Sequence, residues 1–181
     1  MTDATAEQSV TADADDKPEP YNGLPGAFPY AFRATDSLLF KAYVPVALLL
    51  SVAITLVFSF GLITQLAETG SVRGGTFTFS RSFFLFIGLL LVAPLLAPVL
   101  SVARRHRRTG SSVAYDRALA VSAFLFIGSI YLALLTSAPA ELREPTQSAV
   151  VGFFYSLPPI AGVAPPLLAT VLMYLTHRLL K

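Results

Sequence analysis

Residues 42–67 read AYVPVALLLSVAITLVFSFGLITQLA and contain no charged side chain. At a rise of about 1.5 Å per residue, a helix of this length would extend about 39 Å, and the hydrocarbon core of a bilayer is about 30 Å thick. Because backbone amides find no water partner in lipid, such a run crosses the membrane as a helix. The stretch therefore predicts a first membrane span at about residues 42–64.

Three further stretches are also uncharged: residues 82–103, 118–140 and 145–176. Charged residues make up 13% of the 181 residues, against about 25% in an average soluble protein. Four apolar helices would leave too little polar chain to cover them in water. We therefore predict an all-α fold, an integral membrane four-helix transmembrane bundle, with spans at about residues 42–64, 82–103, 118–138 and 150–177.

The N-terminal residues differ in composition from the rest. Residues 1–20 hold six acidic side chains against Lys17 alone and almost no large apolar residue, which predicts a disordered acidic tail. A basic segment before an apolar run is missing there, so a signal peptide is not expected. Residues 21–41 are rich in aromatic residues and proline and predict an interfacial lead-in to a transmembrane domain at residues 42–181. Within the lead-in, Thr35, Asp36 and Ser37 are candidate helix N-caps.

Basic residues are distributed unequally between the two sides of the predicted bundle. Ten fall on the side of the termini and three on the other, where only Arg73, Arg81 and Arg143 lie. Because short cytoplasmic loops carry an excess of Lys and Arg, both termini are predicted to be cytoplasmic, in a multi-pass protein of the cell membrane. The net charge of +2 reflects this topology and does not indicate nucleic-acid binding.

Two regions leave their local structure open. In the loop at residues 68–81, polar and aromatic residues alternate at positions 76–80; we expect an interfacial segment there rather than a hairpin arm. The fourth stretch contains two proline pairs, which interrupt helices. It is either one kinked span over residues 150–177, or a short re-entrant or interfacial piece ending near Leu157 and then a span from about Pro159.

The second and fourth spans share a short similarity. PLLAPVL at residues 94–100 matches PLLATVL at residues 166–172 in six of seven positions. A weaker similarity links residues 34–36 to residues 114–116, each of which precedes a span. The chain is therefore either a tandem duplication of a helical hairpin, with copies related by an axis along the membrane normal, or a case of chance similarity in apolar sequence.

The predicted spans contain no ionisable residue in their interiors, and such residues are usual where membrane proteins move ions or catalyse reactions. The chain has no cysteine and two histidines, and no HExxH or GxSxG motif is present. We therefore expect no catalytic residues, no metal site and no cofactor.

Four weaker features remain as candidates. Ser51, Thr55 and Ser59 form a hydroxyl stripe for helix packing or a polar pathway. Glycines in spans two and three, Gly88 and Gly128, would allow close helix packing. Prolines free backbone carbonyls that pack or coordinate, and arginines beside the membrane would contact anionic lipid. The prolines are Pro94, Pro98, Pro165 and Pro166. The arginines are Arg104, Arg105, Arg107 and Arg108.

The segments YNGLPGAFPYAFRATDSLLF (residues 21–40) and APLLAPVLSVARRHRR (residues 93–108) resemble an uncharacterised family of small four-span membrane proteins of haloarchaea. The resemblance implies no activity, substrate or site residue. From the residues themselves we expect a non-enzymatic accessory or assembly subunit that contacts membrane lipids and a membrane-protein partner or further copies of itself. The alternative is a small transporter or channel built around the proline-broken fourth span.

Overall fold

A computed structural model describes residues 23–70, 75–143 and 148–181, with the side chains of residues 75–78 excepted. The predicted acidic tail at residues 1–20, and Arg73 among the basic residues, lie outside this part of the chain. Over the described ranges the chain is helical and contains no strand. The predicted all-α class is therefore confirmed.

Four helices in the described part are long and apolar enough to cross a membrane. They are α2 (Leu38–Thr69), α3 (Gly75–Arg108), α4 (Val113–Thr136) and α6 (Ala164–Leu179), the last continuing the 3-10 helix η2 (Pro159–Val163). Three shorter helices complete the described part of the chain: α1 (Gly23–Ala34), η1 (Ala140–Leu142) and α5 (Ala149–Ser156). The predicted four spans are present. Helices α2 and α3 extend beyond both ends of their predicted spans, and α4 begins before its predicted span.

Serine side chains cap two of the spans at their N-termini. The Ser37 hydroxyl accepts a hydrogen bond from the backbone N–H of Phe40, and the Ser112 hydroxyl accepts one from that of Tyr115. Between α3 and α4 the chain reverses through Gly110, whose φ of +77° is accessible to glycine at little cost. Of the three candidate caps before α2, Ser37 is the one used.

Two segments outside the predicted spans are helical. Residues 76–80 belong to the first turns of α3, so the hairpin arm is excluded, and the interfacial position expected for this segment stays a prediction. The lead-in also forms a helix, α1, whose side chains Ala27, Phe28 and Ala31 are buried.

The fourth stretch follows the second of the two alternatives. α5 ends at Ser156, the chain is extended at Leu157 and Pro158, and the span then begins with Pro159 in η2. Pro165 and Pro166 lie in the first turn of α6, where a missing N–H removes no helical hydrogen bond. A single kinked helix over residues 150–177 is therefore wrong.

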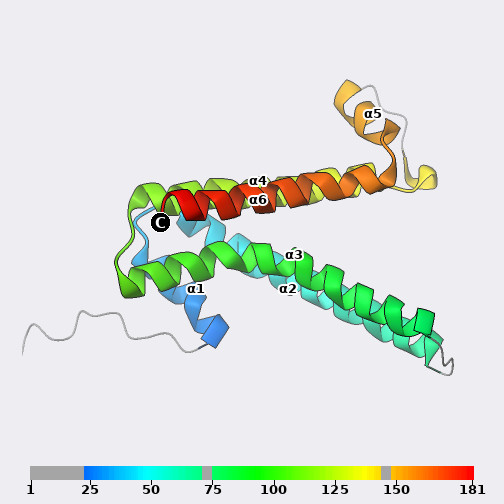
Figure 1. Cartoon of the computed structure of the whole chain (residues 1–181), viewed down its shortest axis with the longest axis horizontal. Coiled ribbons are helices and arrows are strands. Elements are labelled where there is room, and N and C mark those ends of the chain that lie inside the picture. Colours follow the sequence, from blue (N-terminus) through cyan, green and yellow to red (C-terminus); the bar gives the residue numbers. More distant parts are fainter. Residues whose placement is uncertain (1–22, 71–74, 144–147) are drawn as a thin grey trace, which may run out of the picture.

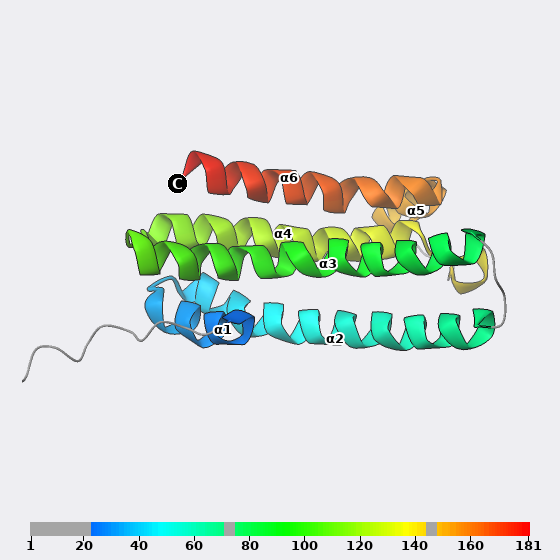
Figure 2. The same ribbon diagram turned by 60° about the horizontal axis from the view of Figure 1, so that its bottom comes forward.

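The spans pair as two hairpins, α2 with α3 and α4 with α6 (Figure 1). The hairpins meet where α3 ends and α4 begins, which we call the arginine-rich end, and they diverge toward the opposite end, which we call the loop end (Figure 1). Figure 2 shows the four long helices along one common direction, with α1 beside the start of α2. Both hairpins run in the same direction, as a duplication would require, but the duplication itself stays a prediction.

Burial is concentrated at the arginine-rich end. On α2 the buried apolar residues run from Phe40 to Ala47, and on α3 from Leu95 to Ala103. Helix α1 packs against α2 and α3 there, and α4 contributes Tyr115, Leu119 and further residues to Phe126. From Val52 onward α2 has no buried apolar side chain. The bundle therefore has a packed half and an open half.

Candidate functional site at the arginine-rich end

A buried carboxylate lies at the centre of the packed half. Asp116, in the first turn of α4, is 1% exposed. Its Oδ2 accepts a hydrogen bond from the Thr35 hydroxyl at 2.6 Å, and its Oδ1 accepts one from the Ser111 hydroxyl at 2.7 Å. His106 Nε2 lies 2.9 Å from Oδ2. We call Thr35, His106, Ser111 and Asp116 the aspartate cluster.

The aspartate cluster joins two parts of the chain that are distant in sequence, Thr35 and the turn between α3 and α4. Thr35 links α1 to α2, His106 lies in the last turns of α3, and Ser111 lies in the turn before α4. The Thr35 oxygen also accepts from the backbone N–H of Ser37 at 3.2 Å, which leaves its own proton for Asp116. Because buried polar groups without partners are costly, these contacts hold the two hairpins together at this end.

A second set of contacts ties α6 to α3 and α4. The Tyr115 hydroxyl lies 2.6 Å from His177 Nδ1, and the Arg105 guanidinium lies over the Tyr115 ring, 4.1 Å from its centroid. Arg105 also donates to the backbone carbonyl of Leu180 at 2.7 Å. Arg105 is therefore a packing residue as well as a basic one. Its neighbours Arg104, Arg107 and Arg108 are exposed in the same helix end.

The α3 prolines are also in the packed half, where Pro94 and Pro98 are buried. Beside them the hydroxyl of the fully buried Tyr43 donates to the backbone carbonyl of Leu95 at 2.7 Å. The Tyr43 ring meets Phe124 of α4 edge-on, with centroids 5.4 Å apart. A tyrosine from α2 thus bonds the backbone of α3 next to its prolines. The carbonyls that Pro94 and Pro98 leave without a helical N–H are those of Leu90 and Pro94, so this bond fastens α2 to α3 and does not replace a bond lost to proline.

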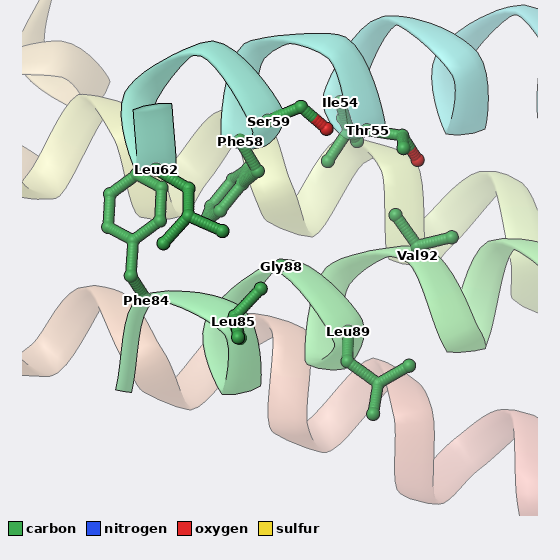
Figure 3. Close-up of a pocket in the computed structure, with 10 residues that line it drawn as sticks. All are labelled: Ile54, Thr55, Phe58, Ser59, Leu62, Phe84, Leu85, Gly88, Leu89 and Val92. Carbon is green, nitrogen blue, oxygen red and sulfur yellow. The ribbon is translucent and has the colours of Figure 1, made fainter. Parts of the chain in front are cut away.

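The hydroxyl stripe divides into two environments. Ser51 is buried, and its hydroxyl has no hydrogen-bond partner among the described residues. Thr55 donates to the Ser51 carbonyl of its own helix at 2.6 Å, and with Ser59 it lines a groove of about 240 Å³ between α2 and α3 (Figure 3). The remaining lining residues are apolar, and Pro165 is not among them. The stripe and the fourth-span prolines therefore do not meet in this groove.

Glycine positions set how closely each hairpin packs. A Cβ on Gly88 would lie 3.0 Å from the Phe58 ring, and one on Gly61 would lie 2.6 Å from the Phe84 ring. The two phenylalanines pack with centroids 5.0 Å apart, and Figure 3 shows their side chains between α2 and α3. A Cβ on Gly128 would meet no described atom within 4 Å apart from its chain neighbours and the backbone of its own helix. The expectation of close packing is thus confirmed at Gly88 and wrong at Gly128.

Arginines at the loop end are also structural. Arg81 donates to the Thr69 carbonyl at 2.6 Å and to its hydroxyl at 2.7 Å, which satisfies the C-terminus of α2. Arg143 donates to the carbonyls of Ala138 and Tyr155 at 3.0 and 2.8 Å. Counting basic residues gave the predicted topology, but it did not show that these two arginines hold the ends of helices together.

Sequence reasoning did not single out the aspartate cluster. Asp116 entered only through the similarity of residues 34–36 to 114–116, and His106 only as a member of a basic run. A carboxyl two positions before the predicted span at residues 118–138 was the available signal. In the described ranges, no group of three or more His, Cys, Asp or Glu side chains is placed to hold a metal ion.

Family comparison covers the chain from end to end. Residues 1–181 match a protein family described as Domain of unknown function (DUF8056). The chain belongs to this family. No curated protein and no solved structure matches it. Membership of DUF8056 carries no activity or ligand with it, so the function has to be argued from the four apolar helices and the contacts described above.

Proposed function

We propose that this DUF8056 protein is a non-enzymatic accessory or assembly subunit of the cell membrane, which offers its open half to a membrane-protein partner. One observation carries the proposal: the two hairpins are packed together only at the arginine-rich end. A protein that acted alone would be expected to bury its spans along their full length. In the most apolar segment of each span, the share of residues that is buried ranges from 11% on α2 to 33% on α4.

The open half is apolar on several helices at once. α2 exposes Val57, Phe60 and Ile63, at 60–68% each, and α3 exposes Phe86 and Leu89 at 58% and 65%. Lipid tails cover single helix faces well, but association of helices in membranes depends on complementary packing rather than on exclusion of water. A partner helix placed between the diverging hairpins would supply that packing.

The buried hydroxyl of Ser51 supports the same proposal. It lies at the last buried position of α2 before the open half begins, and it has no partner. Buried polar atoms in native proteins are nearly always hydrogen-bonded. A carbonyl or side chain from a helix inserted between the hairpins would provide the missing contact.

The direction in the membrane follows from the basic residues. The arginine-rich end carries the excess of Lys and Arg, which supports a cytoplasmic location for this end and for both termini. The acidic N-terminal residues and the preference for Arg over Lys support an origin in salt-loving archaea.

The test is a site-specific photo-crosslink in the full-length protein, in its native membrane. A photo-reactive residue at Phe60, in the open half, should give a crosslinked product that contains this protein and one partner protein in a one-to-one ratio. The same residue at Leu49, which is 71% exposed in the packed half, should label mainly lipid. Equal products from both positions, or none from Phe60, would contradict the proposal.

A small transporter is the second candidate, and the unpartnered Ser51 hydroxyl is the observation in its favour. A transporter of this kind would require Ser51, Thr55 and Pro165 to face one cavity. In the structure Thr55 lines the α2–α3 groove, and Pro165 does not line it. Transport of a solute by the purified protein alone in liposomes would favour this candidate and overturn the accessory role.

A further inference from the structure

A second groove lies between α3 and α6, with Leu119 of α4 among its lining residues. Its volume is about 310 Å³, within the usual range for small-molecule sites. Small side chains on one wall, Ala93 and Ala97, leave room that Met173 and Tyr174 on the other wall do not fill. The groove lies between two helices long and apolar enough to span a membrane, a position at which an apolar chain is the matching ligand.

The groove runs toward the arginine-rich end. On α3, Ala93, Ala97 and Ser101 line it one helical turn apart, and the next turn holds Arg104 and Arg105. On α6, Thr170, Tyr174 and His177 line it, and Arg178 and Lys181 follow. Both walls thus end in basic residues.

One contact joins the basic end to the groove wall. Arg178 donates to the hydroxyl of Tyr174 at 3.1 Å, and Tyr174 lines the groove. Arg105 is held against Tyr115 and Leu180, whereas Arg104 and Arg178 are exposed. The basic rim is therefore formed mainly by Arg104 and Arg178, one from each wall.

Little negative charge opposes this rim in the described part of the chain. Glu68 and Glu141 belong to the loop end, since they lie in the last turn of α2 and in η1. Asp116 is buried within the aspartate cluster. Among the described acidic residues, Asp36 alone is exposed at the arginine-rich end, and it precedes α2.

We propose that this groove binds an anionic membrane lipid, with one acyl chain along Ala93 and Ala97 and the phosphate at Arg104 and Arg178. The combination of an apolar groove at membrane depth and a basic rim at the end of the spans matches both parts of such a lipid. Basic clusters in this position attract anionic headgroups. The site is separate from the open half, so it goes beyond the accessory role.

The test counts lipids retained by the purified full-length protein in detergent, by native mass spectrometry. The protein is first equilibrated with equal amounts of phosphatidylglycerol and phosphatidylcholine. Wild type should retain one phosphatidylglycerol in preference to phosphatidylcholine. Replacing both rim arginines, R104Q with R178Q, should weaken phosphatidylglycerol retention about thirtyfold, roughly fivefold per basic residue. Filling the groove with A97L should abolish retention of that lipid.

Matched controls separate this site from charge and bulk effects. R117Q removes an exposed arginine of α4 that does not line the groove, and A53L enlarges an exposed alanine of α2. Both should retain phosphatidylglycerol like wild type. A93L, one turn from Ala97, serves as a second groove variant should A97L not fold, as judged by its size-exclusion profile.

Several results would overturn the proposal. These are equal retention of the two lipids by wild type, normal retention by a folded groove variant, or an equal loss in R117Q. Saturable binding of inorganic phosphate that displaces the lipid would indicate a site for a free anion instead. If phosphatidylglycerol bound only after deletion of residues 1–20, the acidic segment rather than a lipid would be the occupant.

Discussion

At the scale of the residue, Asp116 is a buried carboxyl group held by contacts to three side chains. Two hydroxyls donate to its two oxygens, His106 lies within hydrogen-bond distance, and its side chain is almost fully buried. A carboxylate can accept several such bonds, whereas an amide places an NH₂ group where an acceptor is needed. The packed half therefore depends on the chemistry of this residue and not only on its size.

Asp116→Asn should lower the free energy of unfolding by about 1–3 kcal/mol, because it leaves a buried donor of Thr35 or His106 without its partner. The measurement is an unfolding titration of the purified protein in mixed detergent. Asp36→Asn is the matched control, since Asp36 is exposed at the same end. We expect the control to stay within about 0.5 kcal/mol of wild type. Equal effects of the two substitutions would show that Asp116 has no special role.

Sequence patterns gave part of this residue-scale picture. Ser37 was among the expected caps, and Arg104, Arg107 and Arg108 are exposed beside a span as lipid contact requires. The burial of Asp116 was not predictable, because it depends on Thr35 approaching from 81 positions away. The same holds for Tyr43, whose bond to Leu95 requires knowledge of which helix faces which.

At the scale of the element, the glycines distinguish packed from open helix faces. Gly88 faces Phe58 across the first hairpin. Gly128 lies in a helix of similar composition, but a Cβ added there would meet no described atom within 4 Å outside its own helix backbone and chain neighbours. Both glycines follow the sequence FLFI, so sequence reasoning treated them alike. The helices are apolar on all sides, and a lipid-facing surface is as apolar as a buried one. No polar stripe therefore indicates which face is buried.

Gly88→Leu should destabilise the α2–α3 hairpin by about 1–3 kcal/mol, since a side chain there overlaps the Phe58 ring. Gly128→Leu should leave stability nearly unchanged, because the same side chain enters open space. The two variants are compared by the detergent concentration at which each protein unfolds. A loss of stability at Gly128 as large as at Gly88 would contradict the packing described.

The proline-rich fourth stretch shows how far element boundaries were predictable. The sequence left two alternatives open, and one of them placed the break near Leu157. The structure has the break at Leu157 and Pro158. Gly162 lets η2 pack closely against α4, because a Cβ there would lie 2.8 Å from the Ser137 hydroxyl oxygen and 3.0 Å from the Ala133 carbonyl oxygen. That close approach of η2 to α4 cannot be deduced from the prolines.

At the scale of the whole molecule, the four spans were predictable and their divergence was not. Length and absence of charge are sufficient to identify a membrane helix, and the structure has four such helices. The packed half and the open half differ in contacts rather than in composition. The central claim is therefore that the two hairpins are joined at the arginine-rich end and separate toward the loop end.

This claim is tested most directly by pulsed electron paramagnetic resonance on spin-labelled pairs, for which the cysteine-free chain is well suited. One pair, Leu39 and Val121, lines a common groove between α2 and α4 in the packed half. The other, Leu56 and Leu134, lies on exposed faces of the same helices in the open half. For the protein in lipid nanodiscs, we expect the second distance to be clearly longer than the first. Similar distances for the two pairs would show a bundle closed along its length and would contradict the claim.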